Sequence, residues 1–257
     1  MTAQQADNQQ SGAVEEGLPQ VFMLEQVHAA LEPDPAAGPL PEWVEQNRPF
    51  IADNWQRRLL QTPALFNGIV LLRTGLSLKG THLHVTFQRA EFATFLALLD
   101  SGFPHPDIGN CFGLAALRSA DHALLAGVMG AHTANAGRVY FPGGTPDCSD
   151  VRADGIVDLY GSVRRELEEE TGLKADEMTF ADGWTAIIHG SRTALLKDTL
   201  SAFTAEDLQQ RIETFLASET QPELSSMRIL RHPGDFDAGI MPCFMRPYME
   251  RMLPAKT

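Results

Sequence analysis

The chain has few cysteines, little positive charge and no long apolar run. Its three cysteines, Cys111, Cys148 and Cys243, are widely spaced, and no pair has the spacing of a metal site. A sparse, odd set of this kind is typical of reduced thiols in a cytoplasmic protein. No apolar run is long enough to span a membrane, and residues 1–17 lack the basic start and apolar stretch of a secretory signal. We therefore expect cytoplasmic localisation and no membrane partner.

Basic residues are outnumbered, with 20 against 33 acidic residues and a net charge of −13. Such a surface argues against a nucleic-acid partner, whose phosphates need a basic face. Hydrophobic residues make up 44% of the chain, which is enough for a proper core. A chain of 257 residues accommodates one large domain, or one domain with a substantial extension. No internal repeats are visible.

Patterns along the chain predict an α/β protein in three parts. Polar residues 1–17 have the composition of a disordered tail. Residues 18–107 are expected to form an N-terminal α+β extension packed on the core, and residues 108–257 the main domain. Four prolines within 33–41 indicate a stiff linker. We expect strands at 69–72, 83–87, 112–117, 123–128, 184–189, 193–197 and 227–230. Helices are expected at 43–60, with a fresh helix starting at Pro49, and at 92–99, 165–171, 204–215 and within 236–252.

The most informative segment is 165–173, Arg-Glu-Leu-Glu-Glu-Glu-Thr-Gly-Leu. In a helix, Glu166, Glu169 and Glu170 stand at i, i+3 and i+4, so three carboxylates share one face. Glutamate runs on helices are usually solvated faces, but such close like charges repel, and a divalent cation is the simplest compensation. Hard carboxylate oxygens suit magnesium or manganese. Gly172 is suited to end the helix, since it tolerates a left-handed conformation.

This segment resembles the second half of the Nudix box of the Nudix hydrolase superfamily. Every specified position of that half is matched, namely Arg165, Glu166, Leu167, Glu169, Glu170, Gly172 and Leu173. The first half departs from the pattern, because Gly144 precedes Arg165 by 21 positions, seven more than the family spacing. We interpret this as an insertion within 145–164. It carries four acids that are available to replace the missing box glutamate: Asp147, Asp150, Asp154 and Asp158.

The resemblance implies a Nudix-type α/β/α sandwich with a mixed sheet. It also implies Mg²⁺-dependent (or Mn²⁺-dependent) hydrolysis of the diphosphate linkage in a nucleoside diphosphate derivative, the activity of a pyrophosphohydrolase. The metal ligands would be Glu166, Glu169, Glu170 and the backbone carbonyl of Gly144, where a side chain would block the ion. Arg165 would orient the carboxylates by pairing with an acidic neighbour. Glu168 is expected to pair with Arg164 on the surface.

The general base and the substrate contacts are less well marked. In some relatives a glutamate on a later loop is the base, which makes Glu223 the first choice and Glu219 the second, although both also suit an ordinary loop. The alternative is that a box glutamate activates the water, and Glu169 is, with Arg165 and Glu223, a candidate catalytic residue. Arg192 and Arg138 are the candidates for phosphate contacts, although surface arginines are common. The bound metal and these arginines would have to overcome the acidic field.

Several alternatives stay open. Phe66-Asn67-Gly68 and the enlarged loop are similar to the UDP-sugar hydrolase branch, but ADP-ribose, coenzyme A derivatives and damaged nucleotides are equally admissible substrates. The family often forms homodimers. The rival hypothesis is a non-catalytic module that binds or senses a nucleotide metabolite. The intact carboxylate trio argues against it, because such modules usually have eroded boxes.

Overall fold

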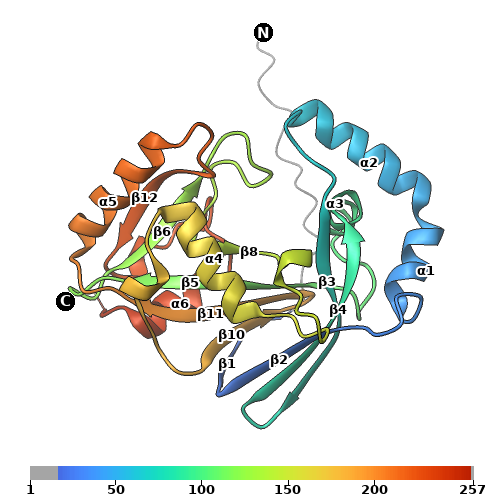
Figure 1. Ribbon diagram of the computed structural model, residues 1–257, viewed down its shortest axis with the longest axis horizontal. Helices are drawn as coiled ribbons and strands as arrows, with labels where there is room; N and C mark the ends of the chain where they lie inside the picture. Colours follow the sequence, from blue (N-terminus) through green and yellow to red (C-terminus); the bar gives the residue numbers. More distant parts are fainter. Residues whose placement is uncertain (1–16, 256–257) are drawn as a thin grey trace.

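The structure, a computed structural model, describes residues 17–255 and contains a large and a small β-sheet (Figure 1). The tail expected at 1–17 lies outside the described residues, except for Gly17. Within residues 17–255, no helix is both long and apolar enough to cross a membrane.

The large sheet is mixed, and its main path runs in the order β1, β10, β11, β5, β6, β12. The β5–β11 pair is parallel, whereas β1–β10, β10–β11, β5–β6 and β6–β12 are antiparallel. The strands of this path are β1 (Gln20–Leu24), β5 (Asn110–Arg118), β6 (Leu124–Met129), β10 (Trp184–His189), β11 (Arg192–Leu200) and β12 (Leu224–Leu230). Three short strands join it: β7 (Val139–Tyr140) on β6, β8 (Gly143–Gly144) on β5 and β9 (Thr179–Phe180) on β11.

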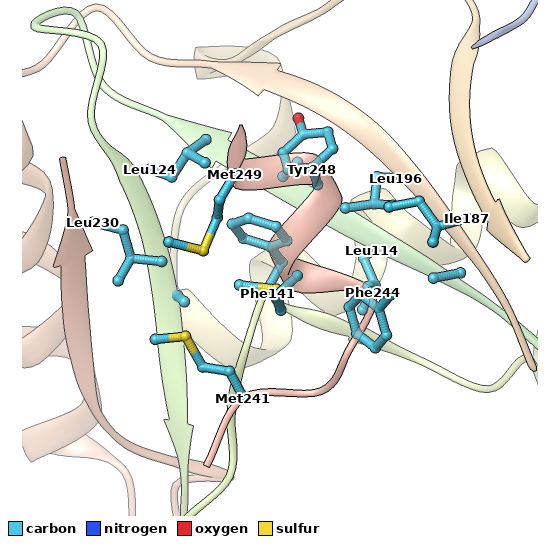
Figure 2. Packing of buried hydrophobic residues seen from close by; sticks show 14 of the residues in the cluster. Leu114, Leu124, Phe141, Ile187, Leu196, Leu230, Met241, Phe244, Tyr248 and Met249 are labelled. Carbon is cyan, nitrogen blue, oxygen red and sulfur yellow. The ribbon is translucent and has the colours of Figure 1, made fainter. Parts of the chain in front are cut away.

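Helices cover both faces of this sheet. Ala115 and Leu117 of β5 pack in a cluster with α4 (Leu159–Thr171) and α5 (Ala205–Ser218). Their neighbours Leu114 and Ala116 belong to a second cluster with α6 (Met245–Met252), shown in Figure 2. Because successive strand residues point to opposite faces, the two clusters lie on opposite sides of the sheet. The expected α/β/α sandwich with a mixed sheet is therefore confirmed.

The second cluster is rich in large side chains that approach from α6 and from the loop before β8. The ring of Phe141 meets that of Tyr248 edge-on at 5.5 Å, and Met241 and Met249 fill the space beside it (Figure 2). Full burial of such side chains is worth roughly 1.5–3 kcal/mol each. This packing fixes the loop that leads into β8, which in turn borders the candidate site.

The small sheet has the order β2, β4, β3, with β2 (Gln26–Leu31), β3 (Ile69–Lys79) and β4 (His82–Glu91). Leu83 and Val85 of β4 pack against Val157 and Leu195 of the larger part. The opposite face, which includes Ala90, packs beneath helices α1 (Pro39–Gln46), α2 (Arg48–Gln61) and α3 (Phe92–Asp100). Figure 1 shows these helices on the side of the small sheet away from α4.

The segment expected as an insertion ties the small sheet to the larger part. Backbone hydrogen bonds join Leu71 N–H to Pro146 carbonyl at 2.7 Å and Leu31 N–H to Gly155 carbonyl at 2.9 Å. A third joins Val157 N–H to the Ala29 carbonyl at 2.9 Å. One turn of 3-10 helix (Cys148–Asp150) interrupts the segment, and two further turns lie at Ala175–Glu177 and Pro233–Asp235. The insertion thus brings residues 146–157 to the junction of the two sheets.

Most expected elements are present, with three differences. The end of the linker expected at 33–41 is wrong, because α1 already begins at Pro39. Proline is tolerated in the first turn of a helix, since the backbone N–H that it lacks would have no partner within the helix there. β3 extends to Lys79, seven residues beyond the expected end at Leu72. The last helix occupies only Met245–Met252 of the expected range. β1 comes from within the expected extension yet pairs with β10, and the domain boundary at 107/108 stays a prediction.

Candidate active site

The acidic segment forms the second half of α4, as its sequence predicts. Asp158 caps the start of the helix, with its side chain accepting a hydrogen bond from Gly161 N–H at 2.9 Å. Gly172 ends the helix in the left-handed conformation, with φ 68°. Gly113 of β5 has no side chain, and an added Cβ there would press against Val163. The helix therefore lies close on the sheet with its acidic turn fixed in place.

The three carboxylates differ in their surroundings. The Glu170 residue is 4% exposed, and its Oε1 accepts a hydrogen bond from Gly143 N–H at 3.4 Å. Its Oε2 is buried and has no hydrogen-bond partner among the described residues. The Glu166 side chain is 19% exposed, whereas that of Glu169 is 60% exposed. Glu166 and Glu170 thus line the interior of the site, and Glu169 borders solvent.

Arg165 joins the acidic groups from one side. Its Nη1 lies 2.8 Å from Glu166 and 3.0 Å from Glu169, and its Nη2 lies 2.9 Å from Asp150. Burial alone would lower the pKa of Arg165, but the hydrogen bond to Asp150 and the charge of Glu166 outweigh it, so its pKa is raised. The guanidinium is therefore a permanent cation that holds two of the three box carboxylates. The expected pairing of Arg165 with an acidic neighbour is therefore confirmed.

Asp150 is the member of the insertion that reaches Arg165. Its side chain is 3% exposed, and its second oxygen accepts a hydrogen bond from Asp147 N–H at 3.0 Å. The other three candidates have local tasks: Asp147 accepts from Ser149 N–H, Asp154 from Ile156 N–H, and Asp158 caps α4. Of the four, Asp150 is thus the acid that contacts Arg165.

Glu223 lies beside the box although it is more than fifty residues away in sequence. It immediately precedes β12, and its backbone carbonyl accepts a hydrogen bond from Gly130 N–H at 2.7 Å. Its negative charge raises the pKa of both Glu170 and Glu166, so the three carboxylates lie within electrostatic range of one another. Glu219, the second choice, is exposed and follows the last residue of α5. The role of Glu223 as base stays a prediction, but its position suits the role.

Burial and mutual repulsion raise the pKa values of these acids. Burial is the main cause for Glu166, and the charges of Glu169 and Glu223 add to it against the opposing Arg165, so its pKa is about 7. Burial, then Glu223 and Glu166, raise the pKa of Glu170 well above its usual value. For Glu223, burial again raises the pKa, with His132 opposing. The single positive charge of Arg165 thus does not neutralise all the carboxylates around it.

This donor set fits a divalent cation. Glu170 offers an unpartnered, buried oxygen, and Glu166 and Glu223 are destabilised in their charged forms, which a bound cation would reverse. Among residues 17–255, no three acidic, histidine or cysteine side chains are placed as a complete coordination set. Binding would therefore require small side-chain movements, for which the exposed Glu169 has room.

The two glycines before the insertion have different environments. Gly143 has φ 135°, and a Cβ there would collide with the carbonyl oxygen of Gly113. A Cβ at Gly144 would meet nothing within 4 Å. Contacts within the protein therefore require glycine at Gly143, whose N–H also reaches Glu170, and not at Gly144. The proposed metal contact of the Gly144 carbonyl stays a prediction.

The ion pair expected between Glu168 and Arg164 is wrong. Glu168 does not pair with Arg164: its carboxylate accepts from Ala175 N–H at 2.8 Å and lies 3.9 Å from Lys174. Arg164 instead lies over the ring of Tyr160.

The two arginines proposed to contact phosphates lie at different places. Arg138 precedes β7, and its side chain donates to the Gly239 carbonyl at 3.4 Å. Arg192 is the first residue of β11, where it is paired with Asn110 of β5. Their phosphate contacts stay predictions.

Tyr140 and His132 are neighbours of the acids that the sequence patterns did not single out for this role. Burial raises the pKa of the Tyr140 hydroxyl, and Glu170 and Glu223 raise it further, so it is a neutral phenol close to both. Asn135 donates a hydrogen bond to that hydroxyl at 3.1 Å. His132 lowers the pKa of Glu223. Sequence spacing gives no signal for either, because His132 reaches the site from the β6–β7 connection and Tyr140 from β7.

Comparison with known proteins adds little. No protein-family model and no curated protein sequence matches the chain. Three solved structures show weak similarity. DR0079 from Deinococcus radiodurans is 14% identical, with TM-score 0.39, over 56% of this chain and 83% of its own. The MutT protein from Methanosarcina mazei Go1 is 18% identical, with TM-score 0.37, over 56% and 91%. A Nudix hydrolase from M. smegmatis, RenU, is 18% identical, with TM-score 0.30, over 48% and 69%. These values are too low to assign a family or an activity.

Proposed function

We propose that the chain is a magnesium-dependent pyrophosphohydrolase of the Nudix type, acting on a small nucleoside diphosphate derivative. The observation that supports this most is the cluster of Glu166, Glu170 and Glu223, in which Glu170 is buried with one oxygen unpartnered and the charges raise one another's pKa values. Proteins rarely bury carboxylates without partners unless a ligand or a cation compensates them. A diphosphate bound through divalent cations is such a ligand.

Each residue of the site has a part in the proposed reaction. Glu166 and Glu170, with Glu169 at the solvent border, would hold Mg²⁺ or Mn²⁺. Such ions neutralise phosphate charge and acidify a bound water. Asp150 holds Arg165, and Arg165 holds Glu166 and Glu169, so the carboxylate oxygens keep a defined arrangement.

Glu223 is proposed as the general base. Desolvation raises its pKa, which makes its carboxylate a better proton acceptor than a glutamate with the ordinary pKa. It would accept a proton from the attacking water, while the oxygen of that water bonds to phosphorus and the bond to the bridging oxygen breaks. Loss of a general base commonly slows a reaction by about 100- to 10,000-fold.

The first experiment is a hydrolysis panel with Mg²⁺ or Mn²⁺, covering UDP-sugars, ADP-ribose, coenzyme A derivatives and oxidised nucleotides. We expect at least one class to be cleaved, with Glu170→Gln and Glu223→Gln each lowering kcat by orders of magnitude. Glu168→Gln is the matched control, because it lies on the same helix but contacts Ala175 N–H. Equal rates in wild-type protein and Glu170→Gln would refute the assignment.

The same panel tests the rival hypothesis of a binding module. Thermal stabilisation by a nucleotide and Mg²⁺ without any product would favour a sensor. Arg192→Ala and Arg138→Ala test the substrate contacts, since the loss of a phosphate contact raises KM. Cytoplasmic localisation and a homodimer remain predictions, for which fractionation and light scattering are the direct measurements.

A further inference from the structure

Three histidines gather on one face of the small sheet, apart from the box. His82 and His84 are two positions apart on β4, so their side chains leave the strand on the same side. His28 of the neighbouring strand β2 is paired in register with His84 (Figure 1). We refer to these three residues as the histidine trio. The proposed hydrolytic mechanism makes no use of them.

The trio is accessible from solvent. Leu83, which lies between His82 and His84, packs against the larger part of the protein, so the trio points to the opposite face of the sheet. His28 is exposed, and the side chain of His82 is 39% exposed. A cavity of about 410 Å³ adjoins His28 and His84. Water or a small ion can therefore reach the ring nitrogens.

The ring of His28 is stacked against both of the others. Its centroid lies 4.7 Å from that of His84 and 5.5 Å from that of His82, with 18° between the ring planes in each pair. His28 Nε2 lies 3.3 Å from His82 Nδ1. Two nitrogen ligands that are each roughly 2.0–2.1 Å from one tetrahedral ion stand about 3.4 Å apart. These two nitrogens thus have the separation of ligands that share an ion.

Neighbouring groups favour the ring forms that bind metals. On the other side of the His82 ring, Nε2 lies 3.7 Å from the Glu25 carboxylate. A carboxylate at one ring nitrogen commonly keeps the proton there, which leaves the other nitrogen to the metal. Desolvation lowers the pKa of His84, and the charges of His28, Lys79 and His82 lower it further, so its ring is neutral at pH 7. Neutral imidazole is the form that coordinates a metal.

We propose that the histidine trio binds a divalent transition-metal ion, with Zn²⁺ as the representative ion. His28 Nε2 and His82 Nδ1 are already placed as two ligands. Among residues 17–255 no three such side chains form a complete coordination set, so His84 turns its ring out of the stack to become the third ligand, and water is the fourth. Imidazole suits Zn²⁺, Ni²⁺ and Cu²⁺, whereas Mg²⁺ prefers oxygen ligands. The ion joins β2 to β4 and gives the chain a second metal site, separate from the carboxylate cluster.

The first test is a calorimetric titration of the full-length protein with Zn²⁺ in the presence of excess Mg²⁺. Mg²⁺ competes for sites made of carboxylate oxygens and leaves imidazoles free. We expect Zn²⁺ to bind, and His28→Gln and His82→Gln each to weaken this binding by at least about tenfold. Absence of binding by the wild type, or wild-type affinity in either variant, overturns the proposal.

Three control variants locate the ion. His105→Gln is the matched control, because His105 also faces a carboxylate, at 4.0 Å, but lies outside the trio. Glu170→Gln removes a member of the carboxylate cluster. Cys243→Ser removes a thiol whose Sγ lies 3.2 Å from His189 Nδ1, a pair that offers Zn²⁺ another site. All three should bind Zn²⁺ as the wild type does, and loss of the binding in any of them overturns the proposal.

Chemical protection tests the site in the wild-type protein, where no substitution can disturb folding. Diethyl pyrocarbonate modifies neutral imidazole nitrogens, and a bound ion blocks them. Mass spectrometry should show that Zn²⁺, added with excess Mg²⁺, lowers the modification of the histidine trio severalfold and leaves that of His105 unchanged. Equal modification of the trio with and without Zn²⁺ overturns the proposal.

Discussion

Raising the pH of the metal-free protein should lower its free energy of unfolding, and the pKa shift of Glu166 sets the size of this loss. Its pKa rises from 4.5 to about 7 on folding. A raised carboxyl pKa means that the folded state holds the proton more tightly, so this stability is present below the unfolded pKa and is lost as pH rises through the folded pKa. The shift corresponds to at most about 3 kcal/mol between about pH 5 and pH 8.

Thermal unfolding followed by circular dichroism in EDTA measures this effect. A loss of this size should lower the Tm by about 5–10 °C across the range. Glu166→Gln cannot lose a proton there, so its Tm should fall much less and should exceed that of the wild type at the alkaline end. His84, whose pKa is lowered by burial and by His28, shifts stability in the opposite direction, but it does so in both proteins and cancels in the comparison.

Magnesium supplies the complementary measurement. At alkaline pH, Mg²⁺ should raise the Tm of the wild type, because binding to the folded state alone stabilises it. It should raise that of Glu166→Gln less. A wild-type Tm that stays level or climbs with pH, or a Glu166→Gln curve that follows the wild type, would show that this carboxylate is not held in an unfavourable charged state.

Three further predictions follow from the surroundings of the box. Asp150→Asn leaves Arg165 without its buried anion, and should lower the free energy of unfolding in urea by about 1–3 kcal/mol and reduce kcat; unchanged values would remove Asp150 from the site. Gly143→Ala forces a side chain into an occupied space at positive φ and should cost more than about 2 kcal/mol, whereas Gly144→Ala should change stability by less than about 0.5 kcal/mol in the same assay. Burial raises the pKa of the Cys111 thiol to about 12, so mass spectrometry should find Cys111 unlabelled by iodoacetamide in the native protein and labelled in urea; labelling of native Cys111 would contradict its burial.

The sequence predicts the parts of this structure that local signals specify. The helix at the box follows from its acidic face and from Gly172, and α5 follows from Thr204 with Asp207, which form the expected cap. Polar and apolar residues alternate from His82 to Phe87, which predicts β4, because residues on the buried face of a strand occupy every second position.

What sequence could not predict depends on contacts between distant segments. Asp150 reaches Arg165 only because the insertion folds back along the small sheet, and nothing in its spacing separates it from Asp147. Pro39 and Pro41 of the expected linker belong to α1, because Leu40 and Trp43 of this helix pack in a buried cluster with α2 and α3.

The pairing of β1 with β10 bears on how the chain can be dissected. A truncated protein starting near residue 108 would uncover a row of unpaired amide and carbonyl groups along β10, a surface on which other chains can add strands. Such a fragment should aggregate even if it retains every residue of the candidate site. Any attempt to isolate the larger part alone should therefore retain Gln20–Leu24 or place charged residues along the strand that it leaves open.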